Sequence, residues 1–117
     1  APIAPGCRYS KRRPPGGEVW RERAFEIVLD GAWVTGVFDR VVIARAPDGR
    51  INGVCVYDFK TDRVEDETQL AGSIGRHETQ LNIYRRVAAA MTGVPAESVR
   101  CELVFTFSQR SVPVPAR

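Results

Sequence analysis

Two stretches rich in valine and aromatic residues, separated by a turn signal, constrain the fold of this chain more than any other feature. Residues 36–41 and 56–61 both have the composition of β-strands. The segment Pro47-Asp48-Gly49-Arg50 between them is typical of a turn. The sequence therefore predicts a β-hairpin in which these two stretches lie on adjacent strands.

The expected register of this hairpin brings two carboxylates together. If a four-residue loop closes the hairpin with Ala46 opposite Ile51, then Asp39 falls opposite Asp58. Side-chain carbons of directly opposed residues lie roughly 4.5–5.5 Å apart, and two carboxylates at that separation repel each other unless a cation lies between them. We therefore predict a divalent-metal site here, with Lys60 beside it.

Side chains two apart on a strand share a face, so Asp58 and Lys60 project together. The same residues nevertheless allow two other interpretations. Asn52-Gly53 is also typical of a two-residue hairpin turn, and a turn there would move Asp39 away from Asp58. The acids and Lys60 are also consistent with solvated strand ends that carry a surface ion pair.

Several short motifs follow one another along the chain. They are a Glu followed by a Phe in the segment Arg21 to Phe25, then Gly36-x-x-Asp39-Arg40-Val41, then Asp58-x-Lys60-Thr61, and finally Gln80-x-x-x-Tyr84. In order and approximate spacing, this set resembles the PD-(D/E)XK nuclease superfamily. The closest resemblance is to the RecB- and AddA-type nuclease domain at the C-terminus of UvrD-like helicase–nucleases.

This resemblance implies both a fold and an activity. The fold is α+β (α/β), a restriction-endonuclease-like core in which a central mixed β-sheet of about four or five strands carries at least one flanking helix. The activity is that of a Mg²⁺- or Mn²⁺-dependent deoxyribonuclease, an exonuclease or an endonuclease, that hydrolyses phosphodiester bonds of DNA in repair and recombination. Hard oxygen ligands suit these cations.

The resemblance also assigns roles to residues of the motifs. Asp39 and Asp58 would ligate the metal together with the main-chain carbonyl of Phe59. Lys60 would orient or activate the attacking water and offset charge on the phosphate. Because of its place in the motif, Thr61 would support the site.

A helix predicted from His77 to Thr92 carries the last motif, which places Gln80 and Tyr84 on one face with apolar residues. The resemblance implies that Gln80 and Tyr84 support the lysine or contact the DNA backbone. From the pattern alone, an aromatic residue on such a face belongs to the core, whereas a buried amide needs a partner.

The chain departs from the family pattern at its N-terminus. Family members usually carry a further metal ligand, a His or Glu, on a helix before the first strand. Four prolines and three glycines precede Glu18, and they disfavour such a helix. Glu22 would replace that ligand only if its face turned inward, and we expect it to make a structural contact or an ion pair instead.

Length and charge predict the domain organisation. The chain of 117 residues is long enough for one domain but has no room for a helicase motor. We predict a basic Pro/Gly-rich arm or linker over 1–17, a nuclease-like domain over 18–110 and a C-terminal tail over 111–117. The arm fits either a phosphate-contacting segment or a solvated linker. The expected partners are DNA, the helicase portion of a longer parent chain and a partner subunit.

Composition excludes some classes of protein. An apolar run of about 18 residues is missing, so no membrane span is predicted. Three cysteines cannot supply the four ligands of the iron–sulfur cluster that some relatives hold, and the cytoplasm is the expected setting. One alternative to a nuclease stays open at this point: an inactive or truncated nuclease-fold module that binds DNA or a partner subunit.

Overall fold

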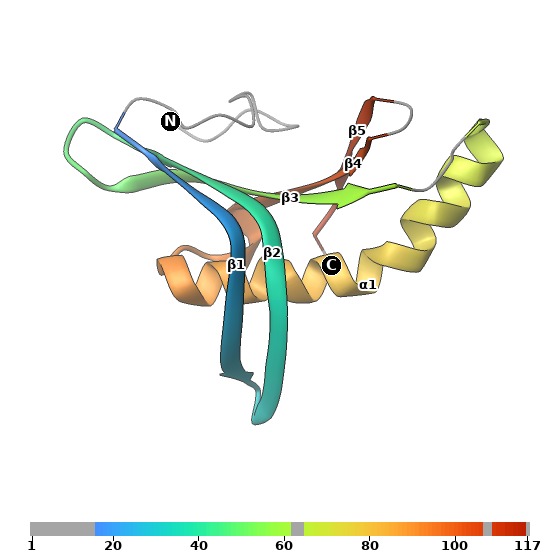
Figure 1. Cartoon of the computed structure of the whole chain (residues 1–117). Helices are drawn as coiled ribbons and strands as arrows, with labels where there is room; N and C mark the ends of the chain where they lie inside the picture. Colours follow the sequence, from blue (N-terminus) through green and yellow to red (C-terminus); the bar gives the residue numbers. More distant parts are fainter. Residues whose placement is uncertain (1–15, 62–64, 107–108, 117) are drawn as a thin grey trace.

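The computed structural model describes residues 16–61, 65–106 and 109–116, which form a five-stranded sheet and a long helix (Figure 1). The elements are β1 (Glu18–Leu29), β2 (Ala32–Arg45), β3 (Ile51–Lys60), α1 (Glu67–Thr92), the 3-10 helix η1 (Ala96–Ser98), β4 (Val99–Phe105) and β5 (Arg110–Val114). The strands lie in sequence order, and only the β3–β4 pair is parallel. This mixed sheet with a flanking helix confirms the predicted α+β, restriction-endonuclease-like fold.

Helix α1 connects the two parallel strands and packs on one face of the sheet (Figure 1). Parallel neighbours need a long crossover connection, and a helix supplies it. The helix begins at Glu67, well before the predicted start at His77, because the Asp66 side chain accepts a hydrogen bond from the Gln69 N–H at 2.8 Å and caps it. Leu70, which is buried in the first turns, holds this early segment against the core.

The β2–β3 register agrees with the prediction along the body of the strands. Arg40 pairs with Tyr57 at the end of the ladder. The same register extended by one step would place Asp39 opposite Asp58, and the two side chains interact with each other. The proximity that suggested a metal site is therefore a property of the folded hairpin.

The turn between β2 and β3 differs from the prediction in detail. Arg45, rather than Ala46, pairs with Ile51, and a bulge next to Ala44 then restores the predicted register. The alternative prediction of a turn at Asn52-Gly53 is wrong, because Gly53 lies within β3 opposite Ala44.

The hairpin of β1 and β2 bends sharply about halfway and extends across α1 (Figure 1). On the sheet side of the bend, the Val41 side chain faces the core under the helix. Beyond the bend, the Phe38 side chain faces the same core. Because these residues are three apart, the regular alternation of side chains along β2 is interrupted between them. Asp39 lies at this interruption. The corresponding residue of β1 is Glu22, which is missing from the ladder and has a φ of 45°, a left-handed conformation that is uncommon for a residue with a side chain.

Three aromatic rings hold the bent hairpin against the helix. Tyr84 of α1 lies 5.2 Å from Phe25 and 5.5 Å from Phe38 between ring centroids, in edge-to-face arrangements. Gly36 lies beneath them, and a Cβ atom there would come within 2.6 Å of the Tyr84 hydroxyl and 2.7 Å of Cζ of Phe25. Glycine at the start of the Gly-x-x-Asp motif thus allows the rings to close over the strand.

The sheet extends past the predicted domain boundary at residue 110. Arg110–Val114 form β5 and pair with β4, so the predicted tail over 111–117 is wrong for its first residues. Pro113 disfavours a strand in the sequence, but a proline is tolerated here because β5 lies at the edge of the sheet. Most of the predicted arm, residues 1–15, lies outside the described residues. Within the part of the chain that is described, no helix is long and apolar enough to cross a membrane.

We predict that Gly36→Ala lowers the free energy of unfolding by about 1–3 kcal/mol, the usual cost of overpacking a core. Urea denaturation followed by circular dichroism measures it. Gly75→Ala in α1 is the matched control: no atom lies within 4 Å of its Cβ position, and alanine is the better helix former by up to about 1 kcal/mol. Equal stabilities for the two variants would contradict this role for Gly36.

Candidate functional site

Asp58 and Lys60 lie near the end of β3 on the face of the sheet that α1 covers. Val56, which shares their side of the strand, belongs to the core under the helix, whereas Tyr57 belongs to a cluster on the opposite face. Lys60 Nζ lies 2.9 Å from Oδ2 of Asp58. The alternation therefore places carboxylate and ammonium together, as the sequence analysis predicted.

Asp39 reaches this pair from the bend of β2. Its Oδ2 accepts a hydrogen bond of 2.8 Å from the main-chain N–H of Phe59. This bond continues the contact between β2 and β3 beyond the end of their ladder and fixes the carboxylate beside the Asp58–Lys60 pair. The predicted role of the Phe59 carbonyl as a metal ligand stays a prediction, whereas its amide has a defined partner.

Burial and like charge act together on Asp58. The residue is only 9 % exposed, and loss of hydration is the main cause that raises the pKa of its carboxyl above the ordinary 3.8, with the adjacent Asp39 as a further cause. Lys60 acts in the opposite direction but does not cancel these effects. Burial beside a second carboxylate therefore outweighs the effect of Lys60 on the pKa of Asp58.

The donor set fits a hard divalent cation. Residues 16–61, 65–106 and 109–116 contain no group of three or more His, Cys, Asp or Glu placed to hold a metal ion. Mg²⁺, however, is commonly held by one or two carboxylates together with water and substrate phosphate. Asp39 and Asp58 are two such carboxylates, and their mutual repulsion is what a bound cation would relieve.

Glu22 lies nearby but does not join the two aspartates. It is exposed, and it lines with Asp39 a cleft of about 310 Å³ at the bend of the hairpin. It forms no ion pair with an arginine of the described segments, so that expectation is wrong. Its backbone conformation at the bend is consistent with the structural role that we expected.

The structure separates the remaining predicted site residues from the carboxylates. Gln80 is exposed on α1, and the described residues include no hydrogen-bond partner for it, so the predicted buried face of the helix is wrong at this position. Tyr84 packs on Phe25 rather than on Lys60. Thr61 is exposed directly after β3. Roles for these three in substrate binding stay predictions.

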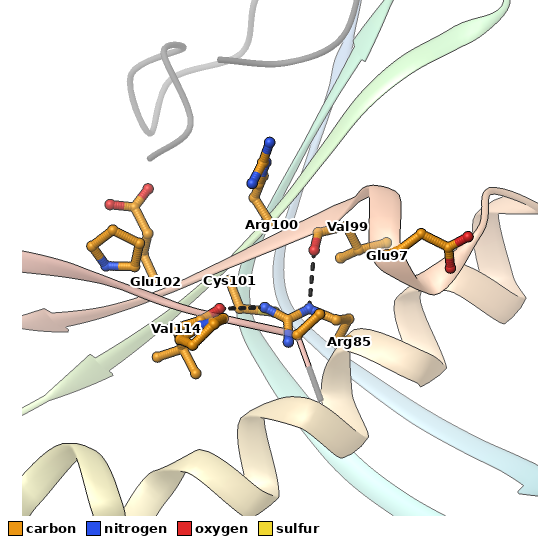
Figure 2. A pocket seen from close by; sticks show the side chains of 10 residues that line it. Arg85, Glu97, Val99, Arg100, Cys101, Glu102 and Val114 are labelled. Carbon is orange, nitrogen blue, oxygen red and sulfur yellow. Dashed lines mark hydrogen bonds between the residues drawn. The ribbon is translucent and has the colours of Figure 1, made fainter. Parts of the chain in front are cut away.

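A buried arginine that the sequence analysis missed lies at the other end of β4. Arg85 is 3 % exposed; its Nε donates to the Val99 carbonyl at 3.0 Å, and one Nη donates to the Val114 carbonyl (Figure 2). The other Nη donates to the Asn82 side chain. Arg85 follows Leu81 by four residues and precedes the buried Ala88 and Ala89 by three and four. A charged residue at this helical spacing among apolar residues was the signal in the sequence for a buried arginine.

Arg85 borders a cavity of about 240 Å³ between α1 and the ends of β4 and β5. Figure 2 shows Arg100 and Glu102 pointing to the other side of β4, away from Arg85. Because the guanidinium already donates to two main-chain carbonyls and an amide, we interpret it as an anchor of the fold.

The raised pKa of Asp58 predicts a particular pH dependence of stability. The folded state keeps this proton to a higher pH than the unfolded state, so stability falls as the pH rises from 3.8 through the raised pKa. In EDTA, Asp58→Asn should therefore be more stable than the wild type at neutral pH, with a difference that vanishes below pH 3.8. Urea denaturation across this range measures it, and a difference independent of pH would contradict it.

Arg85→Met should lower the free energy of unfolding by roughly 2–5 kcal/mol, because several buried acceptors lose their donor. The adjacent Arg86→Met is the control: Arg86 pairs with Asp30 on the surface, and exposed pairs contribute at most about 1 kcal/mol. Equal losses for both variants in chemical denaturation would refute the anchoring role.

The chain was compared with known protein families and with curated proteins. The family model described as PD-(D/E)XK nuclease superfamily matches residues 4–113. This match covers both aspartates, Lys60 and all five strands except the last residue of β5. No curated protein matches the chain.

Proposed function

The chain belongs to the PD-(D/E)XK nuclease superfamily, and we propose that it is a metal-dependent nuclease domain that hydrolyses phosphodiester bonds of DNA. One observation carries this proposal: Asp39 and Asp58, from separate strands, interact with each other beside Lys60. Nucleases of this superfamily are generally hydrolytic and typically use divalent metals.

The residues of the site have distinct tasks in this proposal. Asp39 and Asp58 would hold the cation, which when bound lowers the pKa of a water molecule and stabilises charge on the transferring oxygens. The Phe59 N–H keeps the Asp39 carboxylate in place. Lys60, already in contact with Asp58, would orient the attacking water or contact a phosphate oxygen.

The finer parts of the proposal have different support. The order of the motifs favours a RecB- or AddA-type exonuclease within a larger helicase–nuclease that acts in break repair and recombination in the cytoplasm. The helicase portion and a partner subunit would then be its neighbours. Mg²⁺ is the proposed metal, with Mn²⁺ as a substitute, because the two carboxylates are hard oxygen ligands.

A second candidate function is a nuclease-fold module that binds DNA or a partner without cutting. The observation that favours it is the small number of ligands: in the described segments, no third acid or histidine is placed with the two carboxylates so that the group could hold a metal ion. A weakened metal site would leave the fold intact while it removed the chemistry.

Cleavage of end-labelled linear and circular DNA in Mg²⁺, Mn²⁺ or EDTA tests the proposal. We expect metal-dependent cleavage that falls at least about 100-fold in Asp58→Ala and in Lys60→Ala, the usual effect of removing a group that stabilises the transition state. Asp48→Ala is the matched control, because Asp48 is exposed in the turn at the opposite end of the same hairpin.

Cleavage that persists in EDTA, or that survives Asp58→Ala unchanged, would overturn the proposed site. Absence of cleavage by a folded wild-type chain that still binds DNA would favour the second candidate. Comparison of linear with circular DNA also distinguishes an exonuclease from an endonuclease, since a circle without ends is cut only by an endonuclease.

A further inference from the structure

Two arginines line the cleft beside Asp39 on the sheet face opposite α1. The cleft of about 310 Å³ is formed by Arg21, Glu22, Asp39, Arg40 and Phe59. Arg21 and Arg40 are directly opposed in the β1–β2 register. Phe59 belongs to the apolar cluster on this face, and the Arg40 guanidinium lies 5.5 Å from the centre of its ring. Two cations and an aromatic ring therefore lie beside Asp39.

Arg21 and Arg40 are not bound to a carboxylate of the described parts of the chain, although Glu22 and Asp39 lie in the same cleft. Neither side chain forms an ion pair there, and Nε of Arg40 is buried without a hydrogen-bond partner. Like charges directly opposed on a sheet destabilise it. The reasoning that called for a cation between Asp39 and Asp58 calls for an anion between these two guanidinium groups.

The shape of the guanidinium group and the position of the cleft identify the anion. Planar guanidinium groups bind phosphate oxygens through paired hydrogen bonds. The same cleft contains Asp39, so a phosphate bound there lies beside one of the two proposed metal ligands. We propose that Arg21 and Arg40 bind a backbone phosphate of the DNA strand on the Asp39 side of the site. This inference rests on the proposed function.

Glu22 and Asp39 determine how selective this phosphate site is. Their carboxylates lie in the same cleft and repel a free anion. A phosphate that is part of a DNA strand is held by contacts along the strand as well, so it tolerates that repulsion better than inorganic phosphate does. The site therefore selects polymeric phosphate over the free ion.

Fluorescence anisotropy of a labelled oligonucleotide duplex in EDTA, over a series of salt concentrations, tests this inference. We expect Arg21→Ala and Arg40→Ala each to weaken binding about tenfold, as loss of a charge-assisted hydrogen bond does. Each should also reduce the slope of log affinity against log salt by about 1. Arg40→Lys, which keeps the charge, should retain the salt slope but not the full affinity.

Arg50→Ala is the matched control, because the same charge is removed from an exposed turn, where Arg50 pairs with Asp48. Inorganic phosphate added as competitor should displace DNA only at high concentration. Thermal unfolding of each variant verifies that it is folded, and the exposed Arg21 gives a readout even if Arg40→Ala does not fold.

Wild-type affinity and salt slope in Arg21→Ala, or an equal loss in Arg50→Ala, would overturn the proposal. Calorimetric Mn²⁺ binding must stay unchanged in Arg21→Ala, since its loss would mean that the arginine acts through the metal site. A chain that binds DNA through these arginines but never cuts it would refute the nuclease and leave the phosphate site standing. If the chain cleaves DNA but both arginine variants bind DNA normally, the phosphate site is refuted and the nuclease proposal stands.

Discussion

The packing of Tyr84 and Phe25 over Gly36 is the interaction on which the rest of the structure depends. It fixes the bend of the β1–β2 hairpin against α1, and Asp39 lies at that bend. Two motifs distant in sequence, Gly-x-x-Asp and Gln-x-x-x-Tyr, are thereby joined through a steric requirement: only a residue without a side chain fits under the two rings. The position of a polar group in the site is thus determined by apolar packing outside it.

Charge at the site opposes the stability of the fold. Asp58 is buried beside a second carboxylate, and both causes raise its pKa; a neutral side chain of the same size would fit better. On the opposite face, Arg21 and Arg40 repeat this arrangement with positive charge. Natural proteins concentrate such conflicts at functional sites, and the two clusters, for which we propose a cation and a phosphate, both lie at the same bend.

Local rules were sufficient for the centre of the sheet but not for its periphery. Alternation and turn chemistry predicted that Asp39 faces Asp58, since a register is fixed once one face is buried. The early start of α1 was missed because Gly72 and Gly75 weaken the helical pattern, while packing of Leu70 outweighs their cost. Arg85 was missed because two of its acceptors are main-chain carbonyls of β4 and β5, and no pattern of side chains in the sequence encodes such contacts.

Crystals grown with Mn²⁺ and measured at the manganese absorption edge test the central claim most directly. The bound ion should give an anomalous peak between the carboxylates of Asp39 and Asp58, near Lys60. That peak should disappear in crystals of Asp58→Asn while the hairpin keeps its bend. An anomalous map with no peak between the two aspartates, or with a peak that survives Asp58→Asn, would contradict the metal site and the chemistry that we derive from it.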